Sequence, residues 1–225
     1  NQGVDKIYGV PGESYLSVLD ALYDFNEKIR FISTRHESAA SFMAEAYGKL
    51  TGEAGICFVT RGPGATNASI GVHTAMQNSS PMILFIGQIA RDMTEREAFQ
   101  EIDYKAYFGS ISKWVVQVNN ADRLPEIIGR AFSVALSGRP GPVVVSLPED
   151  MLRELTNATA VSKIKKSCAH ISTNQINVIK DELEKSKRPL IICGGGGWTD
   201  TGRDYLKSFS ESTNIPVICA FRNQD

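Results

Sequence analysis

The chain has 225 residues, which at roughly 150 residues per domain corresponds to about one and a half domains. Its 42% hydrophobic and 22% charged residues exclude a disordered or collagen-like chain. Basic and acidic side chains balance at 24 against 25, and no Lys/Arg cluster is strong enough to neutralise a run of phosphates. No apolar stretch approaches the roughly 20 residues needed to cross a bilayer. We therefore expect no nucleic-acid partner and no membrane partner.

The two ends of the sequence favour a fragment. The chain begins at Asn1, directly before a strand-like run, and only four residues follow the last strand-like run at 215–221. We therefore expect a truncated N-terminus and a cut inside a second domain. The four cysteines, Cys57, Cys168, Cys193 and Cys219, form no Cys-x-x-Cys pair, and three of them lie in apolar runs. Because free cysteines are commonly buried as small apolar side chains, we expect reduced thiols and a cytoplasmic location.

Short β-branched runs alternate with longer segments of helical spacing, which is the pattern of a parallel α/β sheet. The expected strands of the first domain are residues 6–10, 30–33, 54–59, 82–86 and 142–147. Its expected helices are residues 14–25, 38–50, 65–76 and 123–136. The alternation restarts with a helix at 175–185, a strand at 189–193, a helix at 203–213 and a strand at 215–221. We predict an α/β fold with a parallel sheet and helices on both faces, followed by the beginning of a second Rossmann-like α/β domain.

The boundaries follow from a shift in composition. Asn, Thr, Ser and Lys dominate from Thr156 to Thr173, as in a solvated linker. The predicted division is a first domain over residues 1–157, a linker over 158–172 and a partial second domain over 173–225.

The strand-to-helix turns are the places where ligands bind in open parallel sheets. In the first turn, Gly12 allows the backbone to approach a ligand, and Ser14 is expected to cap the following helix. In the second turn, Glu37 lies at the start of a helix, where a carboxylate interacts favourably with the helix dipole. Taken alone, Glu37 is typical of a structural acid in the first turn of a helix.

Two glycine-rich turns follow strands. Residues 60–67 resemble a phosphate cradle but lack the Lys-Ser/Thr of a P-loop and the glycine spacing of the dinucleotide fingerprint. The run Gly194 to Gly197 is compatible with approach to a pyrophosphate and equally with a plain tight turn. The histidines and cysteines show neither metal-ligand spacing nor the spacing of a hydrolytic triad, so we predict no metal ligands in this chain.

Taken together, the turns are more specific than any one of them. The quoted segments are Val-Pro-Gly at 10–12, Arg-His-Glu at 35–37 with its Ala-rich helix, Thr-Arg-Gly-Pro-Gly-Ala-Thr-Asn at 60–67, Gly-Gln at 87–88 and Ala-Phe-Gln-Glu at 98–101. They closely resemble the pyrimidine-binding domain of thiamine-diphosphate enzymes, and the nearest group is the acetolactate synthase (acetohydroxyacid synthase) large-subunit family. The resemblance covers residues 1 to about 155 and, more loosely, the rest, which resembles the start of that family's central domain.

The resemblance implies roles for individual residues. Glu37 would hydrogen-bond N1′ of the aminopyrimidine of thiamine diphosphate and thereby promote loss of the proton on C2 of the thiazolium. Gln100 would take part in catalysis beside it. The pyrimidine pocket would be lined by Val10, Pro11, Gly12, Pro63 and Asn67. The substrate channel would be bordered by Arg61 and Phe99.

The resemblance also implies cofactors and partners. Mg²⁺ and the diphosphate would be held by a Gly-Asp-Gly motif followed at a distance by Asn, which is missing here and belongs to a C-terminal domain. The active unit would be a homodimer or homotetramer formed through the pyrimidine-binding domain, and the isolated fragment would be inactive. Gly194, Gly195 and Gly196 match the first glycine-rich turn of a non-redox FAD site, where other members of the wider superfamily bind ADP or nothing.

Three positions depart from the family pattern around the substrate channel: Ala90 replaces the usual Pro, Arg61 the usual Ser, and Glu149 the usual Lys. Donor and acceptor substrates therefore stay open. The predicted function is decarboxylation of a small-molecule 2-oxo acid, pyruvate in the first instance, with transfer of the two-carbon unit to a second 2-oxo acid. The alternatives are a related decarboxylase or aldehyde-lyase with the same cofactor, and a non-catalytic binding or assembly module.

Overall fold

The computed structural model describes residues 1–167 and 169–223. The chain divides into two compact units, Asn1–Lys166 and Ser167–Asp225, and each is described here by itself. The polar stretch 158–166 belongs to the first unit, because the Gln2 side chain donates to Ser162 O at 3.0 Å and accepts from Ile164 N at 3.0 Å. The first part of the predicted linker thus lies along the first unit.

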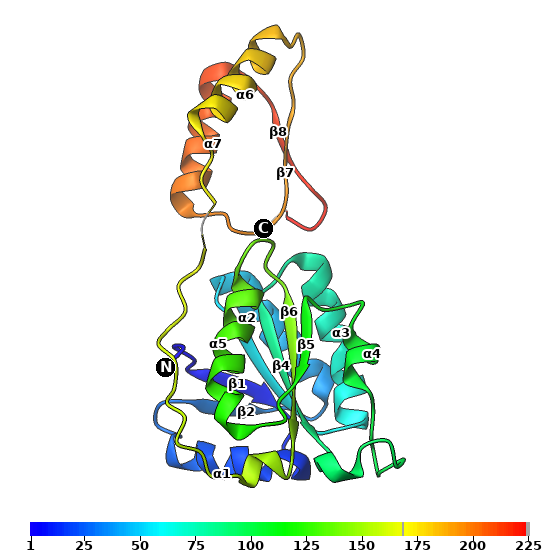
Figure 1. Cartoon of the computed structure of the whole chain (residues 1–225). Helices are drawn as coiled ribbons and strands as arrows, with labels where there is room; N and C mark the ends of the chain where they lie inside the picture. The colour runs from blue at the N-terminus through cyan, green and yellow to red at the C-terminus, as the bar shows by residue number, and fades with distance from the viewer. Residues whose placement is uncertain (168, 224–225) are drawn as a thin grey trace. The chain divides into compact units, whose positions relative to one another are not determined.

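The first unit is built on a six-stranded sheet with the order β2-β1-β3-β4-β6-β5 (Figure 1). Every pairing in it is parallel, which confirms the predicted fold class. Its strands are β1 Lys6–Gly9, β2 Arg30–Ser33, β3 Gly55–Val59, β4 Met82–Gln88, β5 Trp114–Gln117 and β6 Pro142–Pro148. Its helices are η1 Glu13–Tyr15, α1 Leu16–Asp24, α2 Glu37–Thr51, α3 Pro63–Asn78, η2 Arg91–Met93, α4 Tyr104–Phe108, η3 Ala121–Arg123, α5 Leu124–Leu136 and η4 Met151–Arg153.

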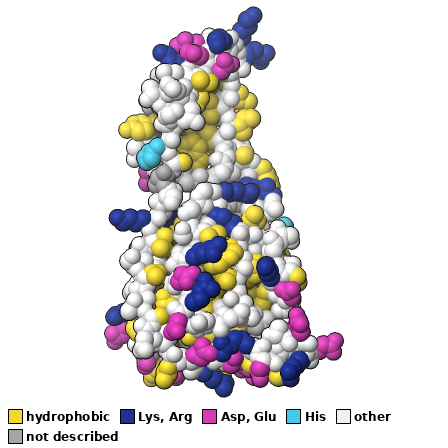
Figure 2. Space-filling view, viewed as in Figure 1, with side chains coloured by type: hydrophobic (Ala, Val, Ile, Leu, Met, Phe, Trp, Pro, Cys, Tyr) yellow, Lys and Arg dark blue, Asp and Glu magenta, His cyan; other side chains and the backbone are white. Residues whose placement is uncertain are grey.

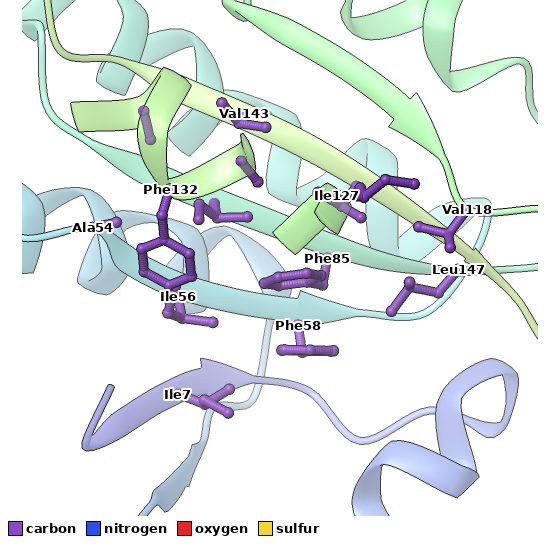
Figure 3. Close-up of a cluster of buried hydrophobic side chains, with 14 of the residues drawn as sticks. Ile7, Ala54, Ile56, Phe58, Phe85, Val118, Ile127, Phe132, Val143 and Leu147 are labelled. Atoms are coloured by element: carbon purple, nitrogen blue, oxygen red, sulfur yellow. The ribbon is translucent and has the colours of Figure 1, made fainter. Parts of the chain in front are cut away.

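Helices cover both faces of this sheet because alternate side chains of each strand point to opposite faces. On one face, Ile56 and Phe58 of β3 lie in a core cluster with side chains of α1 and α5. On the other face, Cys57 and Val59 lie in a cluster with side chains of α2, α3 and α4. Phe58 and Phe85 stack across β3 and β4 with ring centroids 4.6 Å apart (Figure 3). The strands are thus buried on both faces, and their carboxyl ends are held in a rigid row.

The strand order locates a crevice in this row. The chain runs from β1 to β2 on one side and then returns past β1 to β3 on its other side. The connections that follow β1 and β3 therefore leave in opposite directions. Such a switch point leaves a ligand-binding crevice at the carboxyl ends of the two strands. The segments that enter this crevice are residues 10–14 and 60–64.

Two elements of the first unit were not expected. β5 is a four-residue strand at the edge of the sheet, and α4 is a five-residue helix that buries Tyr104 and Phe108. Both are too short to show a clear period in the sequence.

The second unit pairs two parallel strands with two helices: α6 Thr173–Lys185, β7 Ile191–Cys193, α7 Asp200–Thr213 and β8 Val217–Cys219. A capping box between Ser172 and Gln175 begins α6. Large apolar side chains are exposed on this unit, among them Ile192 at 65% and Ile218 at 48%, and Figure 2 shows such side chains on the viewed face. This agrees with the predicted Rossmann-like beginning.

The cysteines of the described residues are free thiols. Cys57 and Cys193 are buried, but Cys219 is exposed, because β8 pairs with β7 alone. The expectation of a core position is therefore wrong for Cys219, and Cys168 lies outside the described residues. No helix within residues 1–167 and 169–223 is both long and apolar enough to span a membrane.

Candidate functional site

Glu37 is the first residue of α2, next to the crevice. His36 caps this helix, since its Nδ1 accepts a hydrogen bond from Ser38 N at 3.2 Å. The Glu37 carboxylate reaches the neighbouring helix α3, where Asn67 Nδ2 donates to Oε2 at 3.0 Å. The positive ends of two helix dipoles therefore converge on this carboxylate. Among the described residues, no group donates a hydrogen bond to the other oxygen, Oε1, which leaves that oxygen able to accept one from a ligand.

Two buried side chains lie beside this carboxylate. Burial raises the pKa of the Cys57 thiol, and the negative charge of Glu37 raises it further. Burial likewise raises the pKa of Tyr15, with smaller contributions from Cys57 and Glu37. The Tyr15 hydroxyl donates to Val10 O, which holds the predicted pocket residue Val10 in place. Glu37 is thus bordered by neutral, buried groups, where electrostatic interactions are stronger than in water.

The turns after β1 and β3 touch each other through small residues. A Cβ added to Gly12 would lie 2.5 Å from Thr60 Cβ, so only glycine allows this approach. A Cβ added to Gly64 would lie 2.8 Å from Thr60 Cγ2 and 3.5 Å from Glu37 Oε1. The two glycines therefore leave room beside the carboxylate that a side chain would fill.

Ser14 fastens these turns together. Its Oγ is hydrogen-bonded to Thr60 Oγ1 at 2.9 Å and accepts from Arg61 N at 3.3 Å. The expectation that Ser14 caps a helix is wrong: η1 begins after Gly12 without a side-chain cap. The hydroxyl is instead used across the crevice, because it faces the β3 turn.

Gly62 places the predicted residue Gln100 at the same turn. Its φ of 55° and ψ of −109° suit glycine alone, and a Cβ on it would lie 2.6 Å from Gln100 Cβ. The Gly62 amide donates to Tyr104 Oη at 2.9 Å, and burial raises the pKa of Tyr104 to about 12. Phe99, adjacent to Gln100, is 73% exposed.

Arg61 is buried at the edge of the crevice, although the sequence predicted it in a substrate channel. It is 8% exposed. Its Nη2 pairs with Glu13 Oε1 and its Nη1 with Glu149 Oε2, each at 2.8 Å. Both terminal nitrogens are thus engaged by carboxylates.

The structure therefore brings most predicted residues of the first unit into one region. Glu37 and Asn67 are in contact, and Gly12, Arg61 and Gln100 lie on or against the turn that precedes α3. Pro11 and Pro63 are exposed beside them.

Several neighbours were missed from the sequence, namely Glu13, Tyr15, Cys57, Thr60 and Tyr104. Thr60 stood in the quoted motif, whereas the contact of Tyr104 with Gly62 left no sequence signal.

The glycines Gly194, Gly195 and Gly196 belong to the second unit and are exposed there. Gly195 has a φ of 75°, and its carbonyl accepts from Asn223 Nδ2 at 3.0 Å. These contacts describe a tight turn after β7. Within residues 1–167 and 169–223, no three His, Cys, Asp or Glu side chains are grouped as metal ligands.

Comparison with known proteins adds a family to this geometry. Residues 1–107 match the model of the thiamine pyrophosphate enzyme, N-terminal TPP binding domain. Over 98% of its length, the chain is 37% identical to the acetolactate synthase isozyme 3 large subunit of Escherichia coli, of which it covers 39%. Over 96% of its length, it is 36% identical to the acetolactate synthase large subunit of Lactococcus lactis, of which it covers 38%. The chain thus spans about two fifths of the length of these relatives.

Proposed function

Since this chain belongs to the thiamine pyrophosphate enzymes and has acetolactate synthase large subunits among its relatives, we propose that its first unit binds the aminopyrimidine of thiamine diphosphate through Glu37. The observation that carries this proposal is the Glu37 carboxylate itself. One of its oxygens is held by Asn67 at 3.0 Å, and its other oxygen accepts no hydrogen bond from the described residues.

The residues present fit such a group. A planar ring needs space beside its hydrogen-bonding partner, and the glycines at 12 and 64 leave that space next to Glu37. The partner must remain in one orientation, and the contact with Asn67 supplies this constraint. Tyr15 and Cys57 keep the surroundings neutral, which strengthens a single hydrogen bond to the ring.

When bound, thiamine diphosphate supplies the electron sink for decarboxylation of a 2-oxo acid. Glu37 holds a proton at N1′ of the pyrimidine through its carboxylate, and Asn67 keeps that carboxylate oriented. The helix dipoles of α2 and α3 stabilise the negative charge of Glu37. Val10, Pro11, Gly12 and Pro63 line the pocket around the ring.

The proposed reaction is decarboxylation of a 2-oxo acid, with pyruvate as the first candidate, and transfer of the two-carbon unit to a second 2-oxo acid. Gln100 acts beside the reacting atoms, while Phe99 and Arg61 border the channel. The position of Gln100 against Gly62 supports this placement, since it adjoins the turn that carries Asn67.

The remaining parts of the proposal concern groups beyond the first unit. Mg²⁺ and the diphosphate are held by a domain outside this chain, in a homodimer or homotetramer formed through the pyrimidine-binding domain. FAD binds at Gly194, Gly195 and Gly196, whose turn after β7 lies at the carboxyl end of a parallel strand. The free thiols agree with a cytoplasmic location.

The test is a product assay on the whole protein that carries this chain, with thiamine diphosphate, Mg²⁺ and pyruvate. Formation of acetolactate that is lost in Glu37→Gln is the expected result. Formation of aldehyde without acetolactate would replace the proposed reaction with that of a decarboxylase. Absence of both products, together with absence of cofactor binding, would instead identify a non-catalytic module.

A further inference from the structure

Arg61 joins three connections at the carboxyl edge of the sheet. It follows β3, whereas its partners Glu13 and Glu149 follow β1 and β6. In the strand order β2-β1-β3-β4-β6-β5, the guanidinium therefore links connections on both sides of β3, across β4 on one side. No single backbone hydrogen bond spans that width.

The charges around Arg61 do not suit a binding site for an anionic substrate. One guanidinium is shared by two carboxylates, so this group of three side chains carries a net charge of −1. Its remaining side-chain nitrogen, Nε, is buried and is the single unpartnered buried polar side-chain atom among the described residues. Bidentate recognition of a substrate carboxylate requires adjacent donors that are free to point at it, and Arg61 uses both terminal nitrogens on protein carboxylates.

The backbone of Arg61 is part of the turn that positions the cofactor residues. Its amide donates to Ser14 Oγ at 3.3 Å, and the next amide, Gly62 N, donates to Tyr104 Oη at 2.9 Å. Gly62 O accepts from Thr66 N at 3.0 Å, which begins α3. One residue later, Asn67 contacts Glu37. A displacement of Arg61 is therefore passed directly to the start of α3.

We propose that Arg61 is a positioning residue, which holds the turn 60–67 through Glu13 and Glu149 and so keeps Asn67 against Glu37, rather than a ligand of the substrate carboxylate. This proposal rests on the proposed function, because it assigns Arg61 to the geometry of the same cofactor site. It makes cofactor affinity, and not substrate affinity, the property that Arg61 controls.

The test measures the dissociation constant of thiamine diphosphate, with Mg²⁺ present, by calorimetry on the whole protein. Arg61→Met removes the charge and leaves two carboxylates facing each other, so we expect affinity to fall about tenfold. Glu149→Gln leaves Arg61 paired with Glu13, and we expect a loss of about threefold. The double variant should bind no more weakly than Arg61→Met, since the repulsion between Glu13 and Glu149 is then removed. Arg123→Met, at an exposed ion pair with Glu126, is the matched control and should bind normally.

Kinetics at saturating cofactor separate the two roles. The KM for the 2-oxo acid should be unchanged in Glu149→Gln and in Arg61→Lys, the second of which keeps the charge if Arg61→Met does not fold. Normal cofactor affinity in these variants, or a raised KM with normal cofactor affinity, would overturn the positioning role and leave the proposed function intact. Failure of the unmodified protein to bind thiamine diphosphate would overturn both.

Discussion

The side-chain amide of Asn67 donates a hydrogen bond to Oε2 of Glu37 over a distance of 3.0 Å and a separation of 30 residues in the sequence. The contact joins the first turns of α2 and α3. The orientation of the carboxylate is therefore set by the neighbouring helix as well as by its own. This makes the start of α3, and the turn before it, part of the site.

Substitution of Asn67 should weaken cofactor binding. Asn67→Ala frees the Glu37 side chain to adopt other rotamers, and we expect the affinity for thiamine diphosphate to fall about tenfold, measured by calorimetry. Asn78→Ala is the matched control, because Asn78 Nδ2 donates to Glu45 Oε1 at 3.0 Å between the same two helices, away from the crevice. That variant should lose thermal stability but keep its cofactor affinity. Equal affinity in the two variants would show that the Asn67 contact is only structural.

Tyr104 should stabilise the turn at Gly62. Tyr104→Phe removes the acceptor of the buried Gly62 amide, and leaving such a donor unpaired costs about 1–3 kcal/mol of unfolding free energy. Tyr107→Phe makes the same chemical change at an exposed hydroxyl, which donates to Ser69 Oγ at 3.3 Å, and should cost much less. Denaturant unfolding measures both, and equal losses would contradict the assigned contact.

The ion pair between Arg91 and Asp150 predicts a dependence of stability on acid pH. Burial works to raise the pKa of Asp150, but hydrogen bonds from the Arg91 side chain and backbone outweigh it and hold the pKa below its ordinary value of 3.8. The lowered pKa stabilises the fold at pH above 3.8, and this contribution is lost as pH falls through the folded-state pKa.

Asp150→Asn should therefore destabilise the protein at neutral pH, and its difference from the unmodified protein should shrink below about pH 4. Urea unfolding at a series of pH values measures this difference. Asn at the exposed position Asp20 is the control and should change stability little at any pH. A difference for Asp150→Asn that stays constant down to the lowest pH would refute the assignment.

Most of the sheet was predictable from the sequence because its strands are buried on both faces and bounded by glycine, proline or polar turns. β4 is the clearest case, with an apolar run that the structure extends only to Gln88. The edge strand Trp114–Gln117 was not predictable, since four residues with one partner strand carry too little pattern.

The site shows the same division. Glu37 and Asn67 were predictable from the motifs that surround them, but their contact was not, because it depends on how two helices pack. Arg61 and Glu149 stood out separately as departures from the family pattern. Only the folded chain shows that they pair with each other, since residues 88 apart in sequence meet at the carboxyl edge of the sheet.

The role of Glu37 is tested most directly by exchange of the C2 proton of bound thiamine diphosphate, followed by NMR in the whole protein. The control for folding is the thermal stability of Glu37→Gln, which keeps the shape of the side chain and a hydrogen-bonding partner for Asn67. We predict fast exchange in the unmodified protein and exchange in Glu37→Gln reduced to about the rate of the free cofactor. Exchange in a folded Glu37→Gln variant as fast as in the unmodified protein would contradict the account.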